Sequence, residues 1–556
     1  MKKSLFLLCC MHLFMHHQLL ASSTLKTTVL NQANSLFTNI LQGKKQFNSA
    51  VESYKKLNSQ NQSFTMGPGV GLPQTVYNTA HTIYNPLYMK NLLYEIAITK
   101  KDPYKWLKQQ EWYALTSLPQ ITCNSCKQTV NFESVAQLNE KQKNFLLLNM
   151  VDNLTLTAKE ELTVSKCPFC GSNNLIFKPQ RYKDFTTQYQ KAMEQQFEHL
   201  DIYKQLNNAE GLPVCRLSIE IADILQDESD KIDSKKLQDL SQFVGKLKNP
   251  LLFIHHYTNP AVKPHLFEKK DDIAWFAHIC QEVIKACPNV THVCPISQPM
   301  ALVQKVSGGM QPPFSIKDIG LMESLKNIFS AKLFKVRVNQ FIQNVAEAQK
   351  QASIKMKQVN PRLKVLVSHQ WKPMKPLHTN WGYQYIAENY IITPMGSKVY
   401  NQDFVDIFKQ QESFFDGIAL SIYRALYFDI AKPIGDNTDD ILDPHASLEA
   451  IVKMNEAFPN KPIYIVEAGL NSTVPQRKRE FINMLLHVCS VASSMNIPVK
   501  TCFFWGLTND IYFYREWNKA PGSTHFGFYE TLNLNNPTGS ITPYGKYFKE
   551  IIASVY

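Results

Sequence analysis

Residues 461–469 read KPIYIVEAG, a short apolar run rich in β-branched residues that ends in a glutamate and a glycine. An amphipathic stretch, QRKREFINMLLHVCSVASSM, follows it at residues 476–495. The first pattern is typical of a buried strand, and the second is typical of a helix. The strand-like pattern occurs at six other places, namely CRLSIEIAD (215–223), NPLLFIHHYT (249–258), THVCPIS (291–297), LKVLVSHQW (363–371), FDGIALSIY (415–423) and VKTCFFWGL (499–507).

These seven runs alternate with amphipathic stretches such as residues 324–352, which is typical of parallel strands joined by helices. An eighth strand near SFTMGPGVG, residues 63–71, would close the sheet on itself. The sequence therefore predicts an α/β protein with a (β/α)8 TIM barrel. We expect five segments along the chain. They are a signal peptide (1–23), a helical N-terminal extension (24–60), the start of the barrel (61–102), an inserted cysteine-rich module in the first βα loop (103–180) and the remainder of the barrel (181–556).

The composition indicates a large folded protein. Of its 556 residues, 44% are hydrophobic and 19% are charged, which excludes a mostly disordered chain. The 59 Lys and Arg outnumber the 46 Asp and Glu, and the formal net charge is +13. Because the basic residues are scattered and do not alternate with aromatic ones, we expect no nucleic-acid partner.

The beginning of the chain has the features of an export signal. Lys2 and Lys3 precede the apolar stretch SLFLLCCMHLFMHHQLLA, which leads into small residues at 21–23. The stretch is short for a membrane span, and no later stretch approaches the apolar length that a spanning helix needs. We therefore expect an exported protein, periplasmic, secreted or lumenal, with no transmembrane segment beyond the signal. An uncleaved N-terminal anchor is the alternative.

Four cysteines form two CxxC pairs. Cys123 and Cys126 lie in CNSC, and Cys167 and Cys170 lie in CPFC. Two such turns can place four thiolates around one Zn²⁺, so we predict a zinc-ribbon-like module that holds a structural zinc. Disulfides are the main alternative, because oxidising compartments favour them, and redox chemistry is a lesser one. We expect no cofactor for catalysis.

Polar and aromatic residues gather where the predicted strands end. In a TIM barrel, the loops that follow the strands form the active site. Trp and Tyr can cover the apolar face of a sugar ring, and Asn, Gln, His and Asp can bind its hydroxyl groups. A carbohydrate or glycoside is therefore the predicted partner. The residues at these strand ends are Arg216, Glu220, His255, His256, Ser297, Gln298, His369, Trp371, Tyr423, Arg424, Glu467, Trp505, Asn509 and Asp510.

Read in order, the segments resemble glycoside hydrolase family 1, the retaining β-glycosidases. The resemblance covers residues 64–78 and 182–552 and is interrupted by the cysteine-rich module. The segments similar to the family's successive strand motifs are MGPGVGLPQ, CRLSIEIADIL, FIHHYTNP, CPISQPM, FDGIALSIY, PIYIVEAG and FFWGLTNDIY. THFGFYE and TPYGKYFKEII are similar to the segments that follow the family's last strand.

The resemblance implies a retaining mechanism, in which two carboxyl groups lie about 5–5.5 Å apart across the scissile bond. It places Glu467 at the nucleophile and Gln298 at the acid/base position, with Arg216 beside the nucleophile. It also implies sugar-binding roles for Gln74, His256, Ser297, Tyr423, Trp505, Asn509 and Asp510.

The chain departs from the family at the acid/base position. Gln298 stands where the family has a glutamate, and an amide cannot transfer a proton at neutral pH. Ser297 replaces the preceding Asn, Ile422 replaces a Tyr, and Ala468 replaces the Asn after the nucleophile. The resemblance therefore implies a glycosidase with a narrowed range of substrates.

Two alternatives remain open from the sequence. The chain could be a catalytically silent relative that binds a glycan without turnover. It could also be a different retaining glycosidase of the same clan, with its acid supplied by His369, Glu220 or Asp510. The joint presence of Glu467 and Arg216 favours an active enzyme, because a silent binder has no need of a nucleophile.

Overall fold

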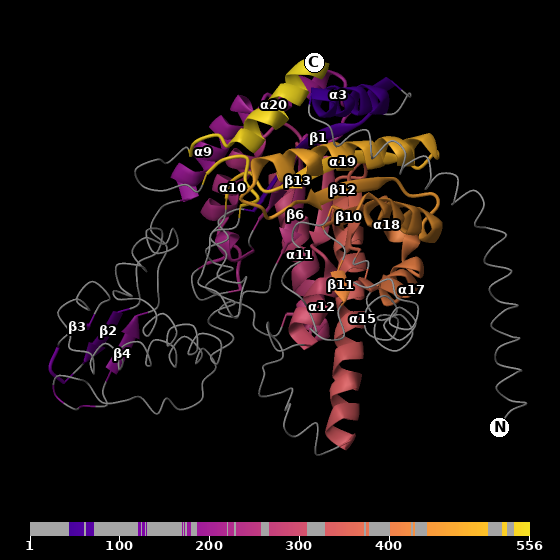
Figure 1. Ribbon diagram of the computed structural model, residues 1–556. Helices are drawn as coiled ribbons and strands as arrows, with labels where there is room; N and C mark the ends of the chain where they lie inside the picture. The colour runs from indigo at the N-terminus through magenta and orange to yellow at the C-terminus, as the bar shows by residue number, and fades with distance from the viewer. Residues whose placement is uncertain are drawn as a thin grey trace, which may run out of the picture.

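Eight parallel strands close into a barrel, hydrogen-bonded in the order β1-β13-β12-β10-β8-β7-β6-β5 (Figure 1). The computed structural model describes residues 44–59, 63–71, 120–123, 125–127, 129–130, 170, 172, 175–178, 186–219, 221–226, 230–256, 266–307, 328–371, 374–376, 401–423, 426–428, 442–509, 525–530 and 539–556. The barrel strands are β1 (Thr65–Gly71), β5 (Cys215–Ser218), β6 (Pro250–His255), β7 (His292–Ile296), β8 (Lys364–Gln370), β10 (Gly417–Ile422), β12 (Ile463–Ala468) and β13 (Val499–Trp505). The predicted (β/α)8 barrel is confirmed, including its first strand within residues 63–71.

Helices follow the strands and cover the outside of the barrel (Figure 1). Asp233, Asp443 and Thr542 accept hydrogen bonds from backbone N–H groups in the first turns of α10, α18 and α20, which fixes where these helices begin. The described helices from α9 onwards are α9 (Thr186–His199), α10 (Ser234–Lys246), α11 (Lys270–Ala286), α12 (Pro299–Ser307), α15 (Ile328–Val359), α17 (Asp403–Lys409), α18 (Pro444–Ala457), α19 (Pro475–Ser494) and α20 (Pro543–Val555), with short 3-10 helices η2 (Ile202–Asn207), η3 (Ile221–Ile224) and η5 (Glu412–Phe414).

The strands are buried on both faces, which explains why they read as nearly continuous apolar runs. One group of side chains fills the barrel, and a larger group packs between the strands and the helices. Inside the barrel, Tyr464 and His292 are hydrogen-bonded at 3.3 Å between Oη and Nε2. Burial lowers the pKa of His292 to about 4, so its imidazole is neutral in the folded protein near neutral pH. The other interior residues include Val214, Leu251, Phe253, Cys294, Leu366, Ala419, Val466 and Phe503.

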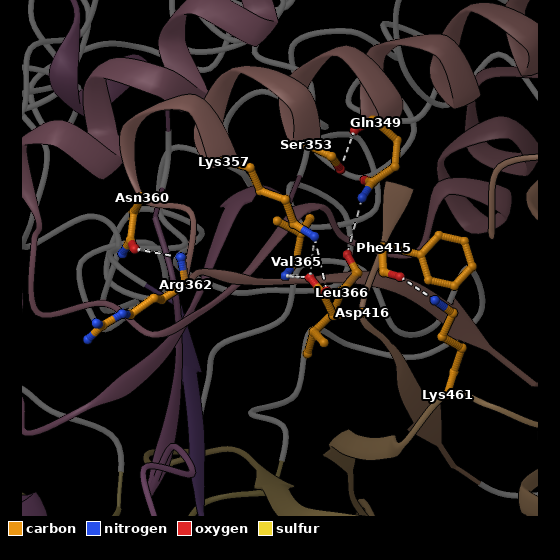
Figure 2. A network of polar contacts seen from close by, with 10 residues as sticks. All are labelled: Gln349, Ser353, Lys357, Asn360, Arg362, Val365, Leu366, Phe415, Asp416 and Lys461. Atoms are coloured by element: carbon orange, nitrogen blue, oxygen red, sulfur yellow. Dashed lines mark hydrogen bonds and ion pairs between the residues drawn. The ribbon is translucent and has the colours of Figure 1, made fainter. Parts of the chain in front are cut away.

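A polar network connects the end of α15 to the beginnings of β8 and β10 (Figure 2). Lys357 Nζ lies 2.8 Å from Asp416 Oδ2, and the same carboxylate accepts a hydrogen bond from Val365 N at 2.8 Å. Gln349 Nε2 donates to Leu366 O at 3.1 Å, and Lys461 Nζ donates to Phe415 O at 2.7 Å. The network lies where β8 and β10 begin, and it fixes the register of these strands there. The predicted active site lies at the opposite end of the barrel, where the strands end.

The chain between β1 and β5 contains a small antiparallel sheet of its own, in the order β3-β2-β4. Its strands are β2 (Gln120–Cys123), β3 (Thr129–Val130) and β4 (Leu175–Lys178). This sheet therefore belongs to the first βα connection, where the sequence predicts an insertion. Two short strands, β9 (Met374–Pro376) and β11 (Leu426–Phe428), pair with each other in parallel beyond β8 and β10.

A helix before the barrel, α3 (Lys44–Ser59), lies within the range predicted as a helical extension and packs against α19 and α20 (Figure 1). Tyr54 Oη donates a hydrogen bond to the side chain of Gln205. Gln205 in turn accepts from Met66 N at 2.9 Å and donates to Met66 O at 2.6 Å. These buried contacts connect the extension to the first barrel strand. Residues 1–23, the predicted signal peptide, lie outside the described residues, and none of the described helices is long and apolar enough to cross a membrane.

Gly67 is required by the close approach of β1 to the segment before β5. A methyl group on Gly67 would lie 1.9 Å from the carbonyl oxygen of Val214. We expect Gly67→Ala to lower the free energy of unfolding by at least about 2 kcal/mol, because backbone would have to move. The measurement is denaturant or thermal unfolding of the purified protein.

The matched control is Gly245→Ala, since Gly245 lies in α10 with nothing within 4 Å of the position of a Cβ atom. That change should stabilise the protein by about 0.5–1 kcal/mol, because alanine is the better helix former. Equal stability of the two variants would contradict the close approach of β1.

Candidate active site

Glu467 is the centre of a group of side chains at the C-terminal ends of the barrel strands. It is the penultimate residue of β12, and only 3% of its surface is exposed. Its Oε1 lies 2.6 Å from Arg216 Nη2, which comes from β5 on a distant part of the barrel wall. The buried carboxylate therefore has a buried cation as its direct partner.

An irregularity in β12 turns Glu467 towards the barrel mouth. Tyr464 and Val466 both point into the barrel, so strict alternation would turn Glu467 outwards. The pairing of β12 with β10 shifts register between Leu420 and Ser421, and its pairing with β13 shifts between Ile465 and Ala468. Such a shift re-aims one side chain without breaking the sheet.

Two further groups contact the other oxygen of the carboxylate. Gln298 Nε2 donates to Glu467 Oε2 at 2.7 Å, and Tyr423 Oη donates to the same oxygen at 3.0 Å. Gln298 Nε2 also lies 3.0 Å from Ser421 Oγ. Gln298 follows β7 with a φ of 45°, in the left-handed region that non-glycine residues rarely adopt. In this conformation the Gln298 amide reaches both Ser421 and Glu467.

Aromatic rings enclose the cation. The guanidinium carbon of Arg216 lies 4.2 Å from the ring centre of Phe253 and 4.9 Å from that of Trp505. Both distances are within the range of a cation–π contact. Arg216 is fully buried, so these rings and the Glu467 carboxylate replace the water that would otherwise surround its charge.

His256 and Trp505 complete the described part of the mouth. His256 Nε2 is 3.9 Å from Glu467 Oε1, and its side chain is 12% exposed. Its ring meets that of Trp505 edge to face, with 6.0 Å between the ring centres. The two rings therefore lie on the Oε1 side of the carboxylate, whereas Gln298 and Tyr423 lie on the Oε2 side.

The structure thus brings together six of the residues predicted from the strand ends, namely Arg216, His256, Gln298, Tyr423, Glu467 and Trp505. Sequence reasoning missed Ser421, which contacts Gln298. Its place two residues before Tyr423 in the strand FDGIALSIY was the available signal, because residues two apart lie on the same face of a strand.

Other predicted residues have different surroundings. Asn509 accepts a hydrogen bond from Gly527 N at 2.7 Å and donates to Glu530 at 2.8 Å, so it joins the loop after β13 to residues 525–530. Ser297 is buried beside the site, and its backbone N donates to His255 O at 2.8 Å. Gln74, Glu220, Arg424 and Asp510 lie outside the described residues.

The two buried histidines near the strand ends lie among aromatic rings. His369 stacks on Phe404 with 4.1 Å between ring centres, and its Nε2 is 2.9 Å from Asn401 Oδ1. His255 packs against Phe267 and Phe276, and burial lowers its pKa to about 3. His369 is fully buried, so the structure does not present it at the mouth as the displaced acid considered from the sequence.

Three of the four predicted zinc ligands lie in or beside the small sheet. Cys123 ends β2 and pairs with Leu175 of β4, and Cys126 follows in the adjacent turn. Ser125 Oγ and Ser172 Oγ are 2.6 Å apart, which brings the turn of CNSC beside Cys170. Cys167 lies outside the described residues, and no group of three metal-binding side chains occurs among the residues that are described. The zinc site stays a prediction.

Removing the cation should strongly destabilise the barrel. We expect Arg216→Met to lower the free energy of unfolding by about 3–5 kcal/mol, because it leaves the Glu467 carboxylate buried without its partner. The double variant Arg216→Met/Glu467→Gln should recover much of that loss, because no charge is then stranded. Thermal unfolding of the purified variants measures both effects.

The control is Lys453→Met, which breaks the exposed ion pair between Lys453 and Glu456 in α18. Exposed pairs contribute at most about 1 kcal/mol, so this variant should unfold close to the wild type. If Arg216→Met behaves in the same way, the ion pair with Glu467 does not stabilise the fold.

Comparison with solved structures shows what this barrel is similar to. The beta-glycosidase BGL167 superimposes with a TM-score of 0.51 at 14% identity, over 66% of this chain and 86% of that chain. A family 1 β-glucosidase from Thermotoga maritima gives 0.48 at 13% identity, over 66% and 87%. A β-glycosidase from Pyrococcus horikoshii gives 0.47 at 17% identity, over 64% and 85%. No protein-family model and no curated protein matches the sequence. The likeness to BGL167 shows that this chain shares a barrel fold with that β-glycosidase.

Proposed function

We propose that the protein is an exported glycoside hydrolase that cleaves β-glycosides by a retaining mechanism, with Glu467 as the nucleophile. The observation that carries the proposal is the Glu467 carboxylate itself, which lies near the C-terminal end of β12 with Arg216 Nη2 at 2.6 Å from its Oε1. The likeness to BGL167 concerns the fold, and the chemistry rests on these residues.

The attacking oxygen in this proposal is Glu467 Oε2. It faces Gln298, which follows β7 and stands where the resemblance to glycoside hydrolase family 1 places the second carboxyl group. Arg216 holds Oε1 and so orients the carboxylate, and Tyr423 donates to Oε2. Trp505 is buried beside the carboxylate, where its ring contacts the Arg216 guanidinium and His256.

Gln298 limits the substrates that can react. Its amide can donate a hydrogen bond to a leaving group but cannot protonate it. Acid catalysis contributes about 10²–10⁴-fold, and without it only leaving groups that are stable as anions depart at a useful rate. We infer that the substrate is a glycoside with such a leaving group.

A catalytically silent glycan-binding protein is the second candidate, and one distance favours it. Gln298 Nε2 donates to Glu467 Oε2 at 2.7 Å, so the amide occupies the space in front of the proposed attacking oxygen. A sugar can reach Oε2 only after the Gln298 side chain moves away. That movement breaks a hydrogen bond to a charged group, worth about 1.5–3 kcal/mol.

Covalent trapping separates the two candidates. We expect a 2-deoxy-2-fluoro β-glycoside with a dinitrophenolate leaving group to add one sugar to the intact protein, because this probe needs no acid. Mass spectrometry of the protein and its peptides should place the sugar on Glu467. The variant Glu467→Gln should take up no sugar.

The matched control is Glu530→Gln, because Glu530 is an exposed carboxylate in the loop beside Asn509. That variant should be labelled as the wild type is. If gluco, galacto and manno probes all leave the wild-type protein unlabelled, the silent glycan-binding function replaces the enzymatic one.

We also propose that the four cysteines of CNSC and CPFC hold one structural zinc. The adjacent turns of Cys126 and Cys170 support this proposal, since zinc ribbons present thiolates from two such turns. Metal analysis of the purified protein should find one zinc per chain, and a chelator should release it. Absence of zinc together with thiols that resist titration would indicate disulfides.

A further inference from the structure

We propose that Phe526 is a positioning residue for the proposed reaction, because its ring holds the Tyr423 side chain that donates a hydrogen bond to the nucleophile, Glu467. The inference rests on the proposed function, since it assigns a role in the attack by Glu467. It deepens that function by naming a residue from the segment after β13 that acts on the carboxylate through Tyr423. Phe526 is half-buried in this segment.

The rings of Phe526 and Tyr423 meet edge to face, with 6.3 Å between their centres and 72° between their planes. Aromatic pairs attract each other in this arrangement, so each ring restricts the orientation of the other. Tyr423 follows the end of β10, and its Oη donates to Glu467 Oε2 at 3.0 Å. The hydroxyl is the atom of Tyr423 farthest from the backbone, so it moves more than any other atom when the side chain rotates. The ring contact therefore determines where the donor lies.

Phe526 also packs directly against the backbone that follows the nucleophile. Gly469 comes immediately after β12, two residues beyond Glu467. A methyl group on Gly469 would lie 2.8 Å from Cδ1 of Phe526 and 2.7 Å from the carbonyl oxygen of Trp505. Glycine at this position therefore lets the ring approach the backbone closely. One ring thus contacts both the side chain that donates to the carboxylate and the backbone next to the residue that carries it.

The segment that carries Phe526 is fixed to the loop after β13. Tyr529 N donates to Leu507 O at 2.9 Å, and Asn509 N donates to Tyr529 O at 2.8 Å. Gly527 N donates to Asn509 Oδ1 at 2.7 Å. A methyl group on Gly527 would lie 2.1 Å from Asn509 N, so the two stretches of backbone are in direct contact. The chain on the C-terminal side of Phe526 is therefore held in place.

A second contact fixes the chain on the other side of Phe526. His525 N donates to Asn471 Oδ1 at 2.7 Å, and Asn471 lies in the loop after β12. The residues before and after Phe526 are therefore each hydrogen-bonded to a different loop of the barrel mouth. Side chains position reacting groups well only when their own conformations are held by neighbouring contacts. Phe526 meets this condition.

The hydrogen bond from Tyr423 gains importance when a sugar enters the site. The Gln298 side chain must then leave Glu467 Oε2, whereas the bond from Tyr423 comes from a different strand end and need not break. A reacting group displaced by about 1 Å can cost about 10²-fold in rate. A donor that keeps Oε2 in place therefore accelerates the attack, and neither Tyr423 nor Phe526 gains or loses a proton in doing so.

The test measures covalent labelling of the full-length protein by the gluco, galacto and manno 2,4-dinitrophenyl 2-deoxy-2-fluoro β-glycosides, over a range of concentrations. The release of dinitrophenolate gives the maximal labelling rate and the half-saturating concentration. We expect Phe526→Leu to lower the maximal rate by about 10–100-fold, because the Tyr423 hydroxyl is no longer held. The half-saturating concentration should stay close to that of the wild type. Phe526→Tyr keeps an aromatic ring and should recover most of the rate.

A double variant shows whether Phe526 acts through the hydroxyl of Tyr423. Tyr423→Phe removes that hydroxyl and should itself slow labelling. Adding Phe526→Leu to it should cost little more, because residues that act as one unit are not additive. Asn471→Ala leaves both rings intact and loosens one anchor of the segment, so it should give a smaller loss that is likewise absent beside Tyr423→Phe. This variant carries the test if Phe526→Leu does not fold, which thermal unfolding checks.

The matched control is Phe414→Leu. Phe414 is a half-buried phenylalanine in η5, just before β10 begins, and its ring lies 5.2 Å from Lys350 Nζ. It lies at the end of the barrel opposite the mouth. This variant loses the same ring as Phe526→Leu and should be labelled at the rate of the wild type.

The outcomes distinguish this inference from the proposed function. If the wild type is labelled and Phe526→Leu reacts at the same maximal rate, Phe526 positions nothing, and Glu467 is still the nucleophile. A raised half-saturating concentration with an unchanged maximal rate would show that Phe526 only binds the sugar, which also overturns the inference. Losses that multiply in the double variant would show that Phe526 acts independently of Tyr423. An unlabelled wild type would overturn both the inference and the proposed function.

Discussion

The ion pair between Arg216 and Glu467 is the interaction on which the barrel mouth depends. Both groups are buried, and each would be strongly destabilising alone. The pair joins β5 to β12 across the mouth, and the rings of Phe253 and Trp505 shield it from water. Low polarity strengthens the attraction between the charges and the hydrogen bonds made to them. Every other group at the site is arranged around this carboxylate.

The barrel supplies these groups from separate parts of the chain. Parallel strands all end on the same side of a barrel, so residues far apart in sequence meet there. Glu467 and Gln298 are 169 positions apart, yet their side chains are hydrogen-bonded. The polar network around Asp416 stabilises the opposite end of β8 and β10. The mouth can therefore contain buried charges and a left-handed residue, Gln298, without loss of the strand pairing.

Replacing a carboxyl group by an amide at position 298 changes the charge of the site at each stage. With two carboxyl groups, one negative charge can move from the nucleophile to the acid/base residue as the reaction proceeds. In the proposed mechanism, Gln298 can neither release nor take up a proton, so the leaving group departs as an anion. The amide at position 298 also explains the direct contact between Gln298 and Glu467. Two carboxylates at 2.7 Å would repel each other, whereas an amide N–H donates a hydrogen bond to a carboxylate.

The sequence by itself determined the eight-stranded barrel and the positions of most site residues. Seven of the eight strands are apolar runs that alternate with amphipathic stretches, and the residues at or just after the C-terminal ends of such strands lie at the mouth, as Tyr423 and Trp505 do. Only the tertiary structure decided which of these residues meet. Alternation along β12 would turn Glu467 outwards, and the register shift that turns it inwards depends on hydrogen bonds to both neighbouring strands. The contact of Gln298 with Glu467 and the burial of His369 against Phe404 likewise depend on distances between strands and helices, which no local pattern encodes.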